Sequence, residues 1–246
     1  MSSTSMSTKC VTPQIAVIIP TLNEEGSIAG LISRLRKLGD FEIIVVDGGS
    51  SDQTIARAQN ADIVLESPPG RARQQNLGAE HAIAKNLLFL HADCELSSGF
   101  DQAIEKVLSR PGVVAGCFSQ RIDHPARKYR LIESGNAWRV RFLGWIYGDQ
   151  GLFVRRQTFL DLGGFPEIAL MEDLFFSKQL RREGRLAISN SPLTVSARRW
   201  EKRGVVLQTL SNWFMITMVH VGVSPDRLAK WYGHVREESA DANKTT

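Results

Sequence analysis

Acidic residues follow short apolar runs at three places in this chain. Asp93 follows the run NLLFLHA, Asp47 follows EIIVV, and the pair Glu172-Asp173 follows IALM. A short unbroken apolar run is typical of a strand that is buried on both faces, as in a parallel sheet. Open α/β sheets bind their ligands beyond the carboxyl ends of such strands. We therefore expect one site for a phosphorylated ligand and a divalent cation, and an enzyme is the leading hypothesis.

The tripeptide His91-Ala92-Asp93 places an imidazole two residues before a carboxylate. Carboxylate oxygens suit Mg²⁺ or Mn²⁺, and imidazole tolerates Mn²⁺. A single strand-end aspartate is usually structural, and a single histidine is more often hydrogen-bonded in a core than bound to a metal. We expect Mn²⁺ or Mg²⁺ as the cofactor, with Asp93 as the stronger ligand candidate and His91 as the weaker one.

Polar residues at two further turns could contact a nucleotide. Asn23 and Glu24 follow the apolar run IAVII, although helix capping alone is the simpler explanation for them. Asp47 precedes two glycines, so its carboxylate could accept a hydrogen bond from a ribose hydroxyl or a base N–H, or it could be a turn aspartate. Arg71 follows a loop rich in proline and glycine, where its guanidinium group could hold a diphosphate; a solvated helix end explains it equally well.

The elements that must position these residues alternate along the first half of the chain. Strands are predicted at 15–20, 42–47, 63–65, 86–90 and 113–118, and helices at 28–38, from 51 or 52 to about 59, 71–84 and 98–108. This alternation predicts an α/β fold with a mostly parallel, doubly wound sheet. Beyond residue 120 we expect a basic helix at 128–145, a strand at 151–155, a helix at 172–183 and a terminal helix from 204.

Length and composition bound the class of protein. The 246 residues are 43% hydrophobic and 23% charged, which fits one main domain. Three scattered cysteines argue against a zinc site or a disulfide framework, so a reducing compartment is expected. The first nine residues are polar and lack the apolar segment of a signal peptide, so we expect a disordered tail at 1–13 and a cytoplasmic protein.

The charge is unevenly distributed and indicates an anionic partner. Residues 1–120 carry 10 basic and 13 acidic side chains, whereas residues 121–246 carry 20 and 13. No helix-turn-helix, zinc-finger or RNA-binding signature is present, so a diphosphate or an anionic lipid fits better than nucleic acid. Neither G-x-G-x-x-G after the first strand nor a P-loop motif occurs, which removes the main support for an NAD-type Rossmann enzyme and for a P-loop NTPase.

The expected terminal helix has an apolar stripe flanked by basic residues. Such a helix could lie on a membrane surface, or it could pack on its own domain, which we favour at roughly three to two. No stretch of about 18 uncharged apolar residues exists, so no membrane span is expected. Peripheral contact with an anionic membrane at its cytoplasmic face is a further expectation. The stripe consists of Val206, Leu210, Trp213, Phe214, Met218 and Val221.

Four motifs occur in an order and spacing that resembles family 2 glycosyltransferases. They are IPTLNEE, VVDGGSSDQT, GRARQQNLGA and LHAD, and the later pieces GDQ, GGFP, MED and SARRW fit the same pattern. The resemblance covers residues 15 to about 200. Within the family, the chain is similar to a small bacterial branch related to 4,4'-diaponeurosporenoate (carotenoid-acid) glycosyltransferases.

The resemblance implies a GT-A fold over residues 14–203, followed by a C-terminal helical extension at 204–246. It implies a nucleotide-diphosphate sugar donor, with the base near Pro20, Glu24 and Asp47 and with support from Arg71. Asp93 corresponds to the last acid of the family's D-x-D motif, whereas His91 stands at the first position. The other donor contacts implied or expected are Thr21, Asn23, Asn76 and Arg199.

The resemblance also implies an inverting transfer in which Asp173, beside Glu172, takes the proton of the acceptor hydroxyl. Both acids could equally cap the helix that begins there, and the two roles are compatible. The acceptor would be small or lipid-linked and would lie near Asp149, Gln150 and Trp200. Two alternatives remain: a catalytically degenerate nucleotide-sugar-binding or membrane-adaptor protein, which His91 supports, and a sugar-phosphate nucleotidyltransferase, which would need a different first loop.

Overall fold

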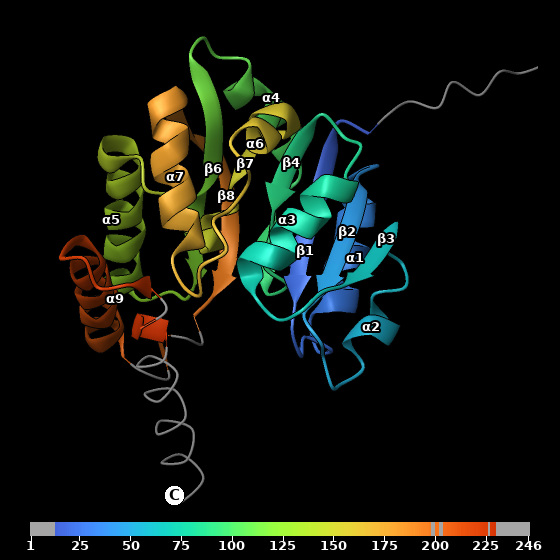
Figure 1. Cartoon of the computed structure of the whole chain (residues 1–246), viewed down its shortest axis with the longest axis horizontal. Helices are drawn as coiled ribbons and strands as arrows, with labels where there is room; N and C mark the ends of the chain where they lie inside the picture. The colour runs from blue at the N-terminus through green and yellow to red at the C-terminus, as the bar shows by residue number, and fades with distance from the viewer. Residues whose placement is uncertain (1–12, 198–199, 202–203, 226, 230–246) are drawn as a thin grey trace, which may run out of the picture.

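The computed structural model describes residues 13–197, 200–201, 204–225 and 227–229, and the account below concerns these residues. Their eight strands form one mixed sheet in the order β3-β2-β1-β4-β7-β6-β8-β5, with helices on both faces (Figure 1). The strands are β1 (Ile15–Thr21), β2 (Glu42–Asp47), β3 (Ile63–Glu66), β4 (Asn86–Phe89), β5 (Cys94–Leu96), β6 (Val113–Asp123), β7 (Phe153–Arg155) and β8 (Arg185–Ser196). The helices are α1 (Ile28–Leu38), α2 (Thr54–Arg57), α3 (Arg71–His81), α4 (Phe100–Leu108), α5 (Arg127–Leu143), the short 3₁₀ helix η1 (Gly148–Gln150), α6 (Arg156–Asp161), α7 (Glu172–Glu183) and α9 (Val205–His220).

The first half of the sheet is parallel, as predicted. β1 pairs in parallel with β2 and β4, and β2 pairs in parallel with β3. Every residue of β1 and β2 is buried, which is what unbroken apolar runs predict for strands covered on both faces. The carboxyl ends of these strands therefore lie at one edge of the sheet, the lower edge in Figure 1.

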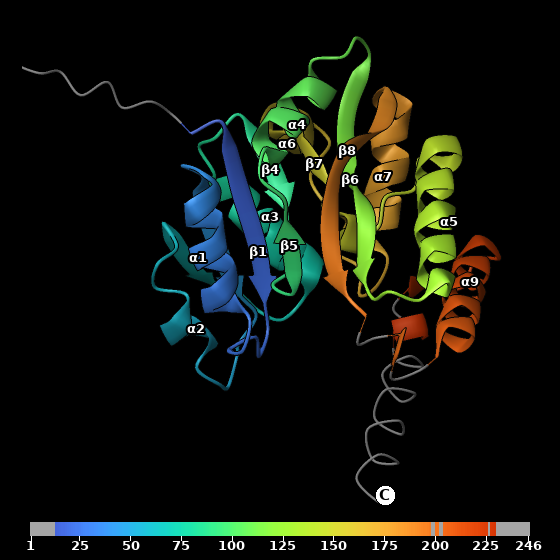
Figure 2. The ribbon, with the colours of Figure 1, turned by 180° about the vertical axis from the view of Figure 1, so that it is seen from behind.

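The second half adds two reversed strands. β7 is antiparallel to both β4 and β6, and β5 is antiparallel to β8, whereas β6 and β8 are parallel to each other. Six of the eight strands consequently run in the same direction, and the sheet is mostly parallel. Figure 2 shows the two long strands β6 and β8 side by side from behind.

Two apolar layers hold the helices on the sheet. One lies under α1 and α4 and includes Leu31 and Phe100, and the other lies under α3, α6 and α7 and includes Phe159 and Phe176. α3 approaches the sheet closely because Gly78 faces it: a Cβ atom there would stand 2.6 Å from a methyl group of β1. The helices thereby fix the loops at the carboxyl edge of the sheet.

The largest difference from the prediction is β8, because no strand was expected between residues 183 and 204. Its sequence, RLAISNSPLTVS, mixes polar and apolar residues. Its pairing register with β6 also shifts, because Phe118 pairs with Ser189 and the next residue, Ser119, pairs with Pro192. A bulge and a proline hide the alternation that marks a strand. β5 and α6 were also not predicted, and α2 is shorter than expected.

The terminal helix α9 begins at Val205, as predicted. No helix in the described ranges is both long enough and apolar enough to cross a bilayer. Residues 1–12 lie outside the described ranges, so the expected tail stays a prediction.

Candidate active site

The loops after β1 and β2 are fastened to each other at the carboxyl edge of the sheet. The buried carboxylate of Asp47 accepts hydrogen bonds from the backbone N–H groups of Gly49 (2.9 Å) and Ser50 (2.7 Å). It also accepts from the hydroxyls of Ser50 (2.5 Å) and Thr21 (3.2 Å). Four donors thus occupy the carboxylate, so Asp47 holds the shape of the glycine-containing loop.

Asn23 and Glu24 reinforce the same connection. Asn23 adopts a left-handed conformation, with φ of 56°, and its side-chain oxygen accepts from the backbone N–H of Ser51 at 2.9 Å. The backbone N–H of Glu24 donates to the hydroxyl of Thr54 at 2.8 Å. Together with Pro20, which pairs with β2, these residues lie at one place, as the sequence predicts.

A residue that the sequence analysis missed bridges the two loops from α3. The buried side-chain amide of Gln74 donates to the backbone oxygens of Thr21 and Val46, both at 2.8 Å. A glutamine on the sheet-facing side of a helix is unusual, because that side is normally apolar. This polar residue at a core position was the available signal.

Glu172 lies at the start of α7 and is almost completely buried, with 4% of its surface exposed. Its nearest charged partner is Arg71 at the start of α3, with 3.5 Å between Nε and Oε1. Burial raises the pKa of Glu172 to about 7; the positive charge of Arg71 opposes this rise and the neighbouring carboxylate adds to it. The pair joins the predicted donor side to the predicted catalytic acids.

Asp173 is held by two backbone donors in the first turn of α7. Its Oδ2 accepts from the N–H of Gly148 at 2.6 Å, and its Oδ1 accepts from the N–H of Leu174 at 2.7 Å. Burial raises the pKa of Asp173, while Arg71 and these two N–H groups counteract the rise. Asp173 thus satisfies one N–H of the first turn, although Met171 is the N-cap residue of α7, and its carboxyl group also has the increased proton affinity that suits a general base.

His91 and Asp173 approach the same point from different elements. A Cβ atom on Gly148 would stand 2.8 Å from Nε2 of His91 and 3.5 Å from Oδ2 of Asp173. Only glycine leaves room for both groups at this position. The structure thus brings the histidine of the LHAD motif beside the acid of the MED motif.

A cavity of about 90 Å³ is lined by His91, and Asp173 is not among its lining residues. Among the described residues, no group of three or more His, Cys, Asp or Glu side chains is arranged to hold a metal ion. Asp93 and His91 both line the cavity, so the predicted metal ligands do lie together, but with too few protein ligands for a complete cage. The cavity is lined by His91, Asp93, Cys94, Asp149, Val195, Ser196 and Trp200.

Asp149 belongs to a polar network that the sequence analysis did not predict. Its Oδ2 accepts from the side-chain amide of Gln120 at 2.8 Å, and the oxygen of Gln120 accepts from Asn136 of α5 at 2.5 Å. Oδ1 of Asp149 and the hydroxyl of Tyr147 are buried without a hydrogen-bond partner in the described part of the chain. Asp149 therefore has one carboxylate oxygen available for a further partner.

The neighbouring Gln150 is buried and occupied. Its oxygen accepts from Arg139 at 2.6 Å and from the backbone N–H of Tyr147 at 3.2 Å. Arg139 also stacks on the ring of Tyr147, 3.4 Å from its centre. Gln150 consequently orders η1 instead of presenting its amide to the cavity.

The other predicted residues take different places. The side chain of Asn76 forms two hydrogen bonds with the backbone of Phe165: it donates to the oxygen and accepts from the N–H, both at 2.9 Å. Trp200 lines the cavity and packs edge-on against Tyr129, with 6.4 Å between ring centres. Arg199 lies outside the described residues.

Comparison with known proteins identifies the family. Residues 16–165 match the model described as glycosyl transferase family 2. The chain belongs to this family. An uncharacterized protein of Mycobacterium tuberculosis CDC 1551 is 29% identical over 227 residues, covering 80% of this chain and 70% of that protein. A PGL/p-HBAD biosynthesis glycosyltransferase of Mycobacterium bovis BCG is 33% identical over 94 residues, which are 34% of this chain and 37% of that protein.

Two solved structures share the fold. Mannosyltransferase PcManGT of Pyrobaculum calidifontis, in complex with GDP-Man and Mn²⁺, has a TM-score of 0.64 at 18% identity, over 88% of this chain and 67% of that one. S. aureus TarS 1–349 has a TM-score of 0.59 at 18% identity, over 75% of this chain, which spans 60% of that structure. The fold is the GT-A fold expected from the motifs.

Proposed function

We propose that this chain is an inverting glycosyltransferase that moves a sugar from a nucleotide-diphosphate donor to a small or lipid-type acceptor. The observation that carries the proposal is Asp173. It is oriented by two N–H groups, has a raised pKa and lies near His91, which lines the cavity, in a family 2 chain. A base of this kind contributes roughly 10²- to 10⁴-fold to the rate.

In the proposed reaction, Asp173 accepts the proton of the acceptor hydroxyl while that oxygen attacks the anomeric carbon. The bond from this carbon to the diphosphate breaks, and its electron pair leaves on the phosphate oxygen. Attack from the side opposite the leaving group inverts the configuration. Glu172 and Arg71 support this step by fixing the first turn of α7 against α3.

The donor would lie along the fastened loops at the ends of β1 and β2. Similar structures were solved with UDP-GlcNAc in TarS and with GDP-Man in PcManGT, which supports a nucleotide-sugar donor here. We assign its base to the loops that contain Pro20, Thr21, Asn23, Glu24 and Asp47. Because the side chains of Asn23 and Asp47 are engaged within these loops, we expect backbone groups to contribute much of the contact. The diphosphate would meet Arg71, and Arg199 is proposed to help there.

A divalent cation, Mn²⁺ or Mg²⁺, fits the residues at this site. Asp93 offers an exposed carboxylate, and Asp149 lines the same cavity with an oxygen that has no partner among the residues that the structure describes. Few protein ligands suffice where phosphate oxygens complete the coordination. When bound, the cation would neutralise charge on the diphosphate. We propose Asp93 as its main protein ligand and His91 as the second.

The acceptor would enter beside Asp149 and Trp200, with Gln150 as a positioning residue. A lipid-type acceptor is supported by the resemblance to carotenoid-acid transferases and by exposed apolar residues on α9. There Trp213 and Phe214 are exposed. We therefore propose peripheral contact with the cytoplasmic face of an anionic membrane.

Transfer from labelled nucleotide sugars in the presence of Mn²⁺ tests the proposal. We expect Asp173→Asn to lose about 10²-fold or more of the turnover and to keep donor binding. Binding without turnover in the unmodified protein would instead identify a degenerate binding protein.

Donor binding is measured by thermal shift with and without Mn²⁺. A ligand at 100 times its Kd stabilises the fold by about 2.7 kcal/mol. Asp93→Ala should abolish the part of the shift that depends on the metal, and the exposed Asp40, in the loop before β2, provides a matched control, Asp40→Ala. A full metal-dependent shift in the Asp93 variant contradicts the assigned cation site.

A further inference from the structure

The outer side of α5 carries large apolar side chains that no other part of the described structure covers. Leu131, Trp138 and Phe142 are 75%, 55% and 60% exposed. Their spacing of seven and four residues places them on one side of the helix. The rings of Trp138 and Phe142 lie 5.2 Å apart. Exposed apolar groups gathered in this way usually mark an interaction surface.

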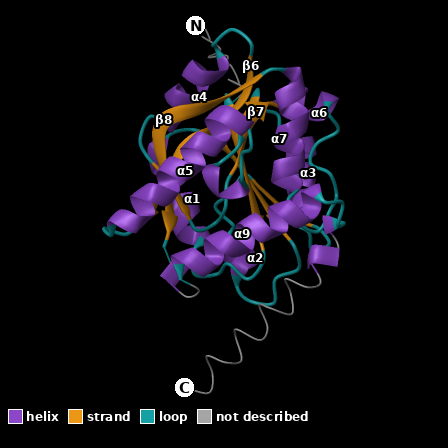
Figure 3. Cartoon of the chain, turned by 90° about the vertical axis from the view of Figure 1, so that its left-hand side faces the viewer, coloured by secondary structure: helices purple, strands orange, loops and turns teal. Residues whose placement is uncertain are grey.

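α9 lies beside α5 and carries exposed apolar side chains of its own. Figures 1 and 2 show the two helices next to each other, and Figure 3 shows both on the side that faces the viewer. In α9, Trp213 is 57% exposed and Phe214 is 45% exposed, and Val221, directly after the helix, is 73% exposed. Met215 and Ile216 are buried. One side of α9 therefore packs on the domain, but it is not the side favoured from the sequence, because Trp213, Phe214 and Val221 of the predicted stripe remain on the outside.

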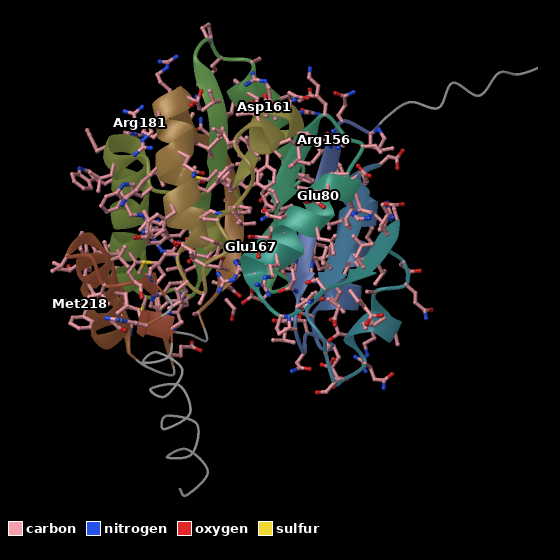
Figure 4. The ribbon with its side chains drawn as sticks, viewed as in Figure 1. Glu80, Arg156, Asp161, Glu167, Arg181 and Met218 are labelled. Carbon is pink, nitrogen blue, oxygen red and sulfur yellow. The ribbon has the colours of Figure 1, made fainter. Side chains whose placement is uncertain are left out.

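Positive charge borders these apolar residues. α5 contains five basic side chains and one acidic side chain, and Arg127, Lys128 and Arg141 are exposed. Arg181 of α7 adds a further charge beyond the end of α5, where its side chain lies against Gly144. In Figure 4, Arg181 and Met218 of α9 lie on the same side of the molecule. Aromatic residues bordered by arginine and lysine suit a surface of apolar chains and anionic headgroups.

We propose that this surface docks on an anionic lipid bilayer. The aromatic face is defined as Leu131, Trp138 and Phe142 of α5 with Trp213, Phe214 and Val221 at α9. The proposal deepens the peripheral membrane contact proposed above by naming the residues that make it, and α5 carries half of them. α5 also begins at the active site, since its Tyr129 packs on Trp200, which lines the cavity. A docked α5 would place the acceptor side of the site near the lipid.

Co-sedimentation with vesicles tests the aromatic face without donor, acceptor or metal. We compare vesicles of phosphatidylcholine with vesicles of equal parts phosphatidylcholine and phosphatidylglycerol. The unmodified protein should bind the anionic vesicles more tightly, and added salt should weaken this binding. The double variant Trp138→Ser, Phe142→Ser should lose about tenfold or more in affinity, because two aromatic side chains no longer enter the lipid.

Matched variants separate the contributions. Ile83→Ser removes a side chain that is 67% exposed on the loop between α3 and β4, and it should bind vesicles like the unmodified protein. The variant with Arg127, Lys128 and Arg141 all changed to Gln should lose the preference for phosphatidylglycerol. These positions are exposed, so circular dichroism of each variant should match that of the unmodified protein.

Three results would overturn the inference: no vesicle binding by the unmodified protein, undiminished binding by the double variant, or an equal loss in Ile83→Ser. The second of these results, found together with a dimer of the free protein that the double variant dissociates, would have a specific meaning. That result would make the face an interface between copies. Because the assay needs no catalysis, an inactive protein that binds vesicles would contradict the proposed function and leave this inference standing.

Discussion

Replacing Glu172 by glutamine should stabilise the protein at neutral pH and have little effect at low pH. Glu172 is 4% exposed, and its pKa is raised from 4.5 to about 7 because burial disfavours the charged form. Arg71 reduces this cost without removing it, since its Nε lies 3.5 Å from the carboxylate. Glutamine has a similar shape and no proton to lose, so it removes only the cost of ionisation.

The direction in which stability changes with pH follows from the number of protons that the folded and unfolded states bind. Between pH 4.5 and about 7, the unfolded chain loses the proton of Glu172 while the folded protein keeps it, so the folded state binds more protons and its stability falls as pH rises. A shift of this size corresponds to about 3 kcal/mol, at 1.36 kcal/mol per pH unit. The Glu172→Gln variant should therefore be roughly equal in stability near pH 4.5 and up to about 3 kcal/mol more stable than the unmodified protein above pH 7.

Urea unfolding at several pH values between 5 and 8 measures this difference. A chain of this length shifts its melting temperature by about 2–4 °C per kcal/mol, so thermal melting gives a second reading. Glu167→Gln is the control, because that carboxylate is 55% exposed and pairs with Arg73 at 2.8 Å. Exposed pairs contribute about 0–1 kcal/mol. A gain for Glu172→Gln that is the same at pH 5 and pH 8 would show that ionisation of Glu172 does not destabilise the fold.

Two substitutions test the roles of close packing and of buried hydrogen bonds. Gly148→Ala should lower turnover by about tenfold or more, because the new Cβ would stand 2.8 Å from the imidazole of His91 and displace the loop that orients Asp173. The control is Gly26→Ala, which should leave kcat unchanged because nothing lies within 4 Å of its Cβ position. Equal rates in the two variants would contradict the argument. Asn76→Ala should reduce the free energy of unfolding by about 1–3 kcal/mol, because the two hydrogen bonds between the Asn76 side chain and the backbone of Phe165 are lost. Urea unfolding, with Asn60→Ala as the control, measures this loss. If the Asn76 variant instead has normal stability and a raised KM for the nucleotide sugar, Asn76 contacts the nucleotide sugar, as the sequence analysis expected.

The first half of the fold was predictable because its signals are local. The strands β1, β2 and β4 are unbroken apolar runs, and α1 has the spacing of a helix with one buried side. Their order along the chain then fixes which carboxyl ends meet. For this reason the grouping of Thr21, Asn23 and Asp47 at one edge could be inferred without a structure.

The second half could not be predicted in the same way because its pairing depends on distant residues. β8 is stabilised by β6 on one side and by β5 on the other, so its own alternation of side chains was not needed to define it. The network around Asp149 has the same character. Gln120 comes from β6 and Asn136 from α5, and neither has a sequence signature that links it to an acidic residue in η1.

The acidic residues of the site show why motifs predict location better than role. Asp47 was expected to contact the nucleotide sugar. Its carboxylate, however, already accepts four hydrogen bonds from nearby residues of the protein. Asp149 was expected on the acceptor side, and one of its oxygens is buried without a partner among the described residues. A carboxylate with all of its acceptor positions used stabilises a loop, whereas one that lacks a partner gains most from a cation or a hydroxyl group. Because those donors come from several elements, the number that reaches each carboxylate is a property of the fold.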